Sequence, residues 1–339
     1  MNAELAAGCL ATLPGATPAR TRDRLAHRPD PCAALRAACA EVAVDVESIA
    51  ERLLRRGTRA YWVGGPRYPI GDELPDRPGV LLAEGGHHEA LRAPRVAVVG
   101  TRSASPHGLA DAREVGAALA SAGVTVVSGL AIGIDGAAHI GALGAGGAVV
   151  GVVATGLDVV YPRRHGALFS RVREHGVLVG EQAFGVGPER FRFPVRNRIV
   201  AALADAVVVV EATLTGGARI TADRALEYGR PVLAIPGSRR NPAAAGANAL
   251  IADGAHPLLD PGDVLVALGL SEGAVAARSV DEPVGPEASA VLRACGGEPA
   301  TSDQLAARTA LGLDAVGAAL RELERARRIE HSRGYWWPR

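Results

Sequence analysis

The sequence predicts an α/β protein built around a parallel β-sheet, and the segment from Arg95 to about Leu270 carries that prediction. Short apolar runs recur along this segment, and most are followed by a loop of small residues and then a helical pattern. The runs lie at residues 96–100, 124–129, 148–154, 176–181, 206–212 and 231–237. Strands that are apolar on both faces and alternate with helices form parallel sheets that helices cover on both sides. Right-handed crossovers then predict an extended Rossmann-like, doubly wound domain, which we place at residues 57–270.

Residues 1–56 predict a small helical N-terminal module rich in Ala, Leu and Arg. The stretch LPGATPARTRDRL places a Pro-Gly turn before a helical pattern. The module is therefore either a plain packing element or a degenerate, SAM-like helix-hairpin-helix that contacts DNA. Residues 61–86 follow as an irregular, Pro/Gly-rich lead-in that ends in a short apolar strand.

The C-terminal part predicts a winged-helix domain at residues 287–339, after a linker at residues 271–286. Thr301 and Gln304 have the spacing of a capping box at the start of one helix. An amphipathic helix is expected at residues 314–328, and RIEHSRGYWW then predicts a hairpin. Helix, turn, helix and hairpin is the order of elements in a winged helix.

Composition limits the classes of function. The chain of 339 residues has a formal net charge of +1, so a polyanion would have to meet a local basic patch. All 37 Lys and Arg residues are arginine, which excludes a Schiff-base lysine and a P-loop lysine. The four cysteines form no CxxC pair, so we expect neither a disulfide framework nor a zinc site. With no signal peptide and no long apolar run, we expect a cytoplasmic chain without a membrane span.

Loops rich in small residues follow the predicted strands and would meet at one edge of the sheet. They are GTRSASPHG (100–108), SGLAIGIDGAAH (128–139), TGLDVVYPRRH (155–165) and EATLTGGARITAD (211–223). Glycine loops that open helices suit phosphate, because the backbone can approach closely and the helix N-terminus attracts anions. The first loop is not a GxGxxG dinucleotide motif, and Arg102 would crowd a pyrophosphate but can clamp a phosphate from the side. The second strand ends in Ser128 and Gly129 without an acid for a ribose, which disfavours a dehydrogenase.

No catalytic residue, metal site or cofactor is expected. Asp135 is interpreted as a cap for the helix that it opens, and His139, one turn later, as its helix-surface neighbour. Glu211 ends a strand alone, whereas acid–base chemistry usually needs a positioned partner.

The stretch ERFRFPVRNRIV, residues 189–200, interleaves four arginines with two phenylalanines. Guanidinium groups bind phosphates and aromatic faces stack on bases, so this composition suits single-stranded nucleic acid. The alternative is an arginine-rich loop paired with Glu181 and Glu189, with both phenylalanines in the core. Arg163 and Arg164, expected at the same edge of the sheet, favour the nucleic-acid interpretation.

Taken together, the motifs resemble the DNA-processing protein A family (DprA, also called Smf). The resemblance rests on VAVVGTRSASPHG, VVSGLAIGIDGAAH, TGLDVVYP, FPVRNRIVAALADAVVVVEA, GARITADRALEYGRPVLAIPG and GANALIADGA, in order between residues 96 and 256. It implies a cytoplasmic protein that binds single-stranded DNA, forms a homodimer through the Rossmann domain, helps to load the RecA recombinase in natural transformation and has no established catalytic reaction. The DNA site expected at the glycine-loop edge comprises Gly100, Arg102, Ser105, Gly129, Gly133, Gly156, Arg163, Phe193, Arg196, Asn197, Arg198, Gly217 and Thr221. The resemblance implies the roles of Arg102, Arg163 and the 196–198 triplet.

The chain departs from the family pattern at two places. Gly216 and Ala218 flank Gly217 where the family often has serines, which puts a hydroxyl contact in doubt. Ile132 stands where arginine is common, which removes one candidate phosphate ligand.

Two other classes of function remain open. A nucleotide-processing enzyme of the phosphoribohydrolase (lysine-decarboxylase-like) group is one, although TGGARITAD departs from the PGGxGTxxE pattern of that group. A regulator that acts through the winged helix is the other, although eight arginines against seven acidic residues from Glu287 onward give that domain no strong basic face.

Overall fold

The computed structural model describes residues 1–41, 44–71, 74–270, 284–295, 300–326, 328–332 and 334–338. The chain divides into two compact units, Met1–Ala274 and Val275–Arg339, which are described separately. Most of the linker expected at residues 271–286 lies outside the described residues. Within the part of the chain that is described, no helix has both the length and the apolar character needed to cross a membrane.

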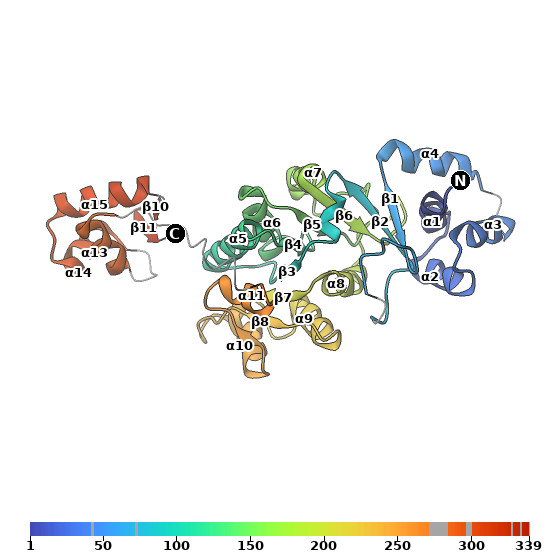
Figure 1. Cartoon of the computed structure of the whole chain (residues 1–339). Coiled ribbons are helices and arrows are strands. Elements are labelled where there is room, and N and C mark those ends of the chain that lie inside the picture. Colours follow the sequence, from blue (N-terminus) through green and yellow to red (C-terminus); the bar gives the residue numbers. More distant parts are fainter. Residues whose placement is uncertain are drawn as a thin grey trace. The chain divides into compact units, whose positions relative to one another are not determined.

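A single large sheet runs through the first unit, with the strand order β1-β2-β6-β5-β4-β3-β7-β8-β9 (Figure 1). Its strands are β1 (Arg59–Trp62), β2 (Val80–Gly85), β3 (Arg95–Val99), β4 (Thr125–Ser128), β5 (Val149–Val152), β6 (Gly176–Gly180), β7 (Ala206–Val209), β8 (Val232–Ala234) and β9 (His256–Pro257). The seven strands β6-β5-β4-β3-β7-β8-β9 pair in parallel, as the buried apolar runs predict. Strand β2 joins β6 antiparallel. The lead-in segment was expected to contribute one strand only, but β1 pairs antiparallel with β2 and extends the sheet.

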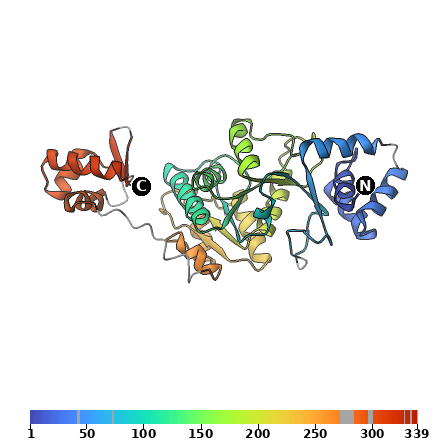
Figure 2. The same cartoon turned by 45° about the horizontal axis from the view of Figure 1, so that its top comes forward.

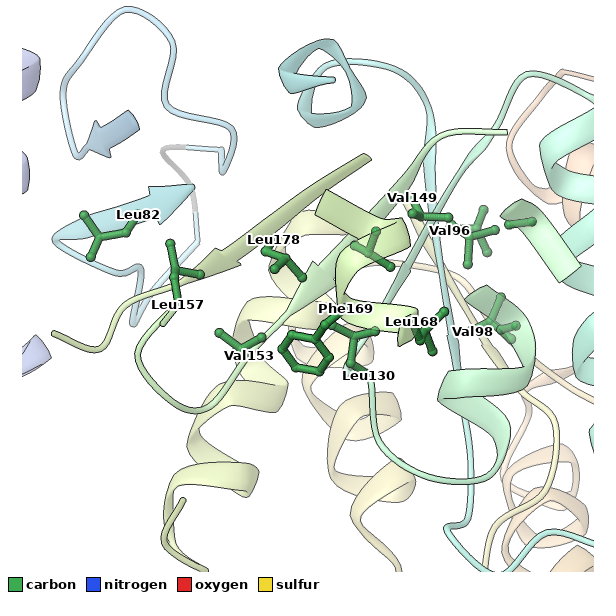
Figure 3. Packing of buried hydrophobic residues seen from close by; sticks show 14 of the residues in the cluster. Leu82, Val96, Val98, Leu130, Val149, Val153, Leu157, Leu168, Phe169 and Leu178 are labelled. Atoms are coloured by element: carbon green, nitrogen blue, oxygen red, sulfur yellow. The ribbon is translucent and has the colours of Figure 1, made fainter. Parts of the chain in front are cut away.

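Alternate strand residues pack into two hydrophobic clusters on opposite faces of the sheet. Val96 and Val98 of β3 belong to one cluster, whereas Ala97 and Val99 belong to the other. Figure 3 shows the first cluster, where Phe169 packs near Leu130 and Leu168. Since both sets of side chains are buried, the sheet is covered on both sides, as a doubly wound fold requires.

Helices on the two faces come from different parts of the chain. The first cluster is covered by α5 (Pro106–Ser121), α6 (Ile134–Gly144), α7 (Gly166–His175) and α11 (Gly262–Ala267). The second is covered by α8 (Arg192–Leu203), α9 (Gly217–Glu227) and α10 (Ala245–Ala252). The chain therefore turns to one face after β3 and to the other after β7, although these two strands are neighbours. Figure 2 gives a second view of this arrangement.

The N-terminal residues form helices, as predicted, and these pack into the first cluster. They are α1 (Ala3–Thr12), α2 (Pro18–His27), α3 (Pro31–Glu41) and α4 (Val46–Arg56). Asn2, Thr17 and Asp45 cap three of these helices through side-chain oxygens. Leu10 and Leu53 are almost completely buried, so these helices extend the core of the first unit.

The second unit is a winged helix with its own small core. It contains α13 (Pro286–Cys295), α14 (Ser302–Thr309), α15 (Leu313–Arg325), β10 (Ile329–Ser332) and β11 (Tyr335–Pro338). The capping box of Thr301 and Gln304 is confirmed at the start of α14. Helix α13 was not predicted, and it supplies Ala288, Val291 and Cys295 to the core.

Candidate nucleic-acid interface

The candidate site lies where the strand order reverses, between β3 and β7. The loops after these neighbouring strands lead to helices on opposite faces, so a crevice opens at the carboxyl ends of the strands. A pocket of about 560 Å³ occupies this position. It brings together the predicted residues Gly100, Arg102, Gly129, Phe193, Arg196, Asn197, Gly217 and Thr221.

The floor of the pocket is set by Arg196, which is 5 % exposed. Its Nη1 donates to the carbonyl oxygen of Gly129 at 2.6 Å and also to that of Val152. A Cβ atom on Gly129 would lie 2.5 Å from Cζ of Arg196, so any larger residue would have to displace the guanidinium from these bonds. Burial lowers the pKa of Arg196 to about 10, which still leaves it charged at neutral pH. Nη1 thus donates to two backbone oxygens and Nε to Oδ1 of Asn197 at 3.3 Å, so we interpret Arg196 mainly as a framework for the pocket.

An aromatic and cationic stack forms one wall. The guanidinium of Arg102 lies 4.8 Å from the centre of the Phe193 ring, and the rings of Tyr161 and Phe193 are 5.4 Å apart. Arg102 and Arg190, which also lines the pocket, are exposed, and neither has a carboxylate partner among the described residues. This wall therefore offers both π surface and unneutralised positive charge.

The opposite wall is the N-terminus of α9. Its N-cap is Gly216, which provides no side-chain cap, so the first N–H groups of the helix have no side-chain acceptor. Such groups attract anions at a helix N-terminus. Asn197 fixes α8 to this helix, because its Nδ2 donates to the carbonyl oxygen of Gly217 at 3.0 Å. Gly216 and Ala218 carry no hydroxyl, and Thr213 and Thr221 are the hydroxyl residues that line this wall.

Five of the predicted site residues do not line the pocket: Ser105, Gly133, Gly156, Arg163 and Arg198. Ser105 caps α5 and donates to Glu211 at 2.6 Å. Gly133 caps α6 with φ +87°. A Cβ atom added to Gly156 would lie 2.5 Å from the carbonyl oxygen of Ala183, so this glycine lies close to the backbone there.

The two arginines of this group differ in their surroundings. Arg163 is exposed in a short 3-10 helix. Arg198 pairs with Glu181 at 2.6 Å, and Arg192 with Glu189 at 2.8 Å. The ion-paired alternative for the arginine-rich stretch therefore holds for Arg192 and Arg198. Arg190 of the same stretch lines the pocket, whereas Arg198 does not.

Several residues that line the pocket were not predicted from the sequence, notably Thr101, Tyr161, Arg190 and Thr213. Tyr161 opens the YPRRH segment, and an aromatic residue two positions before Arg163 is the signal in the sequence that could have indicated it. Arg190 lies three residues before Phe193, and both line the pocket.

Two expectations for α6 are wrong. Gly133, not Asp135, is the N-cap, and the Asp135 carboxylate accepts the N–H groups of Gly129 and Ala131 at 3.1 and 3.4 Å. Burial raises the pKa of Asp135, and nearby Arg196 opposes that shift. His139 is not at the helix surface; it is completely buried, and neither ring nitrogen has a hydrogen-bond partner among the described residues.

Glu211 lies behind the pocket rather than in it. Its carboxylate accepts from the Ser105 N–H at 2.8 Å, the Ser105 hydroxyl and the Asn241 amide at 3.1 Å. These bonds join the loop after β3 to the loop after β8, so the role of Glu211 in this structure is to brace the edge of the sheet.

The sheet, its pocket and the second unit define a Rossmann-like ligand-binding protein with a winged helix. The model of the family DNA recombination-mediator protein A matches residues 60–269, and that of the DprA winged helix domain matches residues 275–334. The chain belongs to the DNA recombination-mediator protein A family, which confirms the resemblance inferred from the motifs.

Several relatives agree with this assignment. Protein Smf of Synechocystis is 36 % identical over 296 residues, which cover 76 % of this chain and 74 % of that protein. The putative DNA processing protein DprA of Mycobacterium tuberculosis is 43 % identical over 232 residues, 65 % of this chain and 60 % of that protein.

Two solved structures are also similar. DprA of Streptococcus pneumoniae has a TM-score of 0.62 at 35 % identity, over 70 % of this chain and 81 % of that one. DprA of Helicobacter pylori, whose structure concerns its single-stranded DNA binding mode, has a TM-score of 0.55 at 27 % identity, over 62 % of this chain and 95 % of that one.

Proposed function

We propose that this chain binds single-stranded DNA in the pocket between β3 and β7, and that it does so as a recombination mediator. The observation that carries the proposal is the stack of Arg102 and Tyr161 around Phe193, beside the uncapped N-terminus of α9. Phosphates would meet Arg102, Arg190 and the helix N–H groups, while bases would stack on the aromatic wall. The solved H. pylori relative, which is described as binding single-stranded DNA, supports the same chemistry for this chain.

Equilibrium binding tests this proposal. Fluorescence anisotropy with a labelled oligothymidine compares the intact chain with Arg102→Ala and with Arg171→Ala, a control that removes an exposed arginine of α7 that does not line the pocket. We expect Arg102→Ala to weaken binding about tenfold and Arg171→Ala to change it little. Equal affinities for both variants would refute the site, and no binding by the intact chain would refute the function.

We further propose that the bound strand is protected and passed to RecA during natural transformation, in the cytoplasm. Support comes from family membership, since the matching model describes a recombination mediator. Strand exchange by RecA on DNA coated with single-strand-binding protein is the test. The chain should shorten the lag before exchange, and an unchanged lag would contradict this role.

A homodimer through the Rossmann domain is the proposed assembly. Leu259, which precedes α11, and Val266, which lies within it, are 78 % and 60 % exposed, so two large apolar side chains of this segment face solvent. Light scattering of Leu259→Arg should report a monomer if these residues form the contact. A variant with unchanged mass would exclude this surface.

A nucleotide-processing enzyme is the weaker candidate, because the carboxylate of Glu211, which could otherwise serve as an acid or base at this edge of the sheet, is already hydrogen-bonded to Ser105 and Asn241. Incubation with a panel of nucleoside monophosphates distinguishes the two functions. Base release that depends on Glu211 would favour the enzyme.

A further inference from the structure

A second groove lies on the other side of the first turn of α8. It has a volume of about 540 Å³ and is bordered by α2, the segment before β2, the end of β6, α8 and α9. The residues of α8 and its approach divide between the two hollows: Arg190 and Phe193 line the pocket, whereas Phe191 and Arg192 line the groove. Pro194 lines both. A ligand that leaves the pocket over Pro194 therefore enters the groove directly.

The groove presents apolar side chains to solvent. Phe191 is 61 % exposed, more than any other aromatic residue among those described, and Val195 and Ile220 are also exposed. The guanidinium of Arg192 lies 5.2 Å from the centre of the Phe191 ring. An aromatic ring in water lacks the favourable free energy of burial, so an exposed ring among other apolar side chains is typical of a binding surface.

Four of the five arginines that line the groove pair with a carboxylate, Arg22 with Asp76 at 3.4 Å among them, unlike Arg102 and Arg190 of the pocket. Arg192 pairs with Glu189 at 2.8 Å, Arg198 with Glu181 at 2.6 Å, and Arg224 with Glu227 at 2.7 Å. Arg102 and Arg190 have no such partner among the described residues. The groove therefore suits flat, largely uncharged groups, and the pocket suits phosphates.

We propose that the groove is a second subsite of the DNA site, which stacks the bases of nucleotides that continue from the pocket, with Phe191 as its platform. This inference rests on the proposed function. Base stacking on an aromatic ring tolerates any sequence and adds affinity without adding phosphate contacts. Strands long enough to reach the groove should therefore bind more tightly than short ones, with a gain that salt hardly changes.

Anisotropy with oligothymidines of about 4 and about 12 nucleotides tests the subsite, since single-strand sites span roughly this range of lengths. We expect Phe191→Ala to weaken binding of the longer strand about tenfold and to leave the shorter strand unaffected. Phe191→Trp, which keeps an aromatic platform, should retain the affinity of the intact chain. Because Phe191 is exposed, its removal should leave thermal unfolding unchanged.

The outcomes separate this inference from the function on which it rests. Equal affinity of Phe191→Ala and the intact chain at both lengths would overturn the second subsite, while a loss in Arg102→Ala would still support the pocket. No binding by the intact chain would refute the proposed function itself. A change of molecular mass in Phe191→Ala, seen by light scattering with no change in DNA affinity, would make the groove a protein contact and overturn the inference.

Discussion

Asp135 and Arg196 hold opposite ends of one residue, Gly129. The Asp135 carboxylate accepts the Gly129 N–H at 3.1 Å, and the Arg196 guanidinium donates to the Gly129 carbonyl oxygen at 2.6 Å. The next residue, Leu130, is completely buried with φ +55°, a left-handed conformation that L residues rarely adopt. These two charged side chains thus fix the turn after β4 on which the pocket floor depends.

Arg196→Ala should therefore destabilise the protein, not merely remove a positive charge. The substitution leaves buried carbonyl oxygens of Gly129 and Val152 without their donor and the buried Asp135 without its nearby cation. We expect a loss of about 3 kcal/mol in the free energy of unfolding, measured by urea denaturation. Arg102→Ala, at an exposed position, should change it by less than about 0.5 kcal/mol. Similar stability of both variants would contradict the framework role of Arg196.

Gly133 offers a matched test of loop geometry. It has φ +87°, and a Cβ atom would lie 2.3 Å from the carbonyl oxygen of Thr101. Gly133→Ala should displace the loop after β3 and weaken both stability and DNA binding. Gly144→Ala, in the last turn of the same helix with no atom within 4 Å of its Cβ position, should be neutral or stabilising by up to about 1 kcal/mol. Thermal denaturation of the intact chain and of both variants measures the difference. Equal melting temperatures of Gly133→Ala and Gly144→Ala would contradict a special backbone requirement at Gly133.

His139 predicts a dependence of stability on acid. Burial lowers the pKa of His139 from 6.5 to about 4, so between these values the unfolded chain binds a proton that the folded chain does not. The stability associated with the neutral ring is complete above pH 6.5 and is lost as the pH falls towards 4. The expected loss is about 3 kcal/mol over this window.

Removing the imidazole isolates this contribution from those of Asp111 and Asp135, whose pKa values are raised by burial and act in the opposite sense. His139→Leu should flatten the fall in stability between pH 6.5 and 4, whereas His256→Gln, at an exposed position, should leave it unchanged. Urea denaturation at several pH values gives the comparison. If the free energy of unfolding of His139→Leu falls as steeply between pH 6.5 and 4 as that of the intact chain, His139 is not the cause of the fall.

Much of the sheet follows from the sequence, because strands such as VAVVG bury both faces and leave no other arrangement for their side chains. The site was harder to predict from the same residues. The family resemblance implies a DNA-binding role for Arg196, and the structure adds that Arg196 shares the helical spacing of Ile199, Val200 and Leu203, all of which are buried. That periodicity indicates a core-facing arginine and was available in the sequence.

Other features had no local signal. The partners of Asp135 are backbone N–H groups of a preceding loop, and Glu211 meets Asn241 across thirty residues of chain. Only the fold brings such groups together. Arg190 and Phe193 line the pocket while Phe191 and Arg192 line the groove. This division depends on the backbone at the start of α8, which composition cannot specify.

The salt dependence of single-strand binding shows whether Arg102 and Arg190 neutralise phosphates in the pocket between β3 and β7. Each phosphate neutralised on a single strand contributes about −0.7 to the slope of log affinity against log salt concentration. We expect tight, strongly salt-dependent binding by the intact chain, and a slope shallower by about 0.7 in both Arg102→Ala and Arg190→Ala but not in Arg171→Ala. Slopes in Arg102→Ala and Arg190→Ala that equal the slope of the intact chain would contradict a phosphate site between β3 and β7.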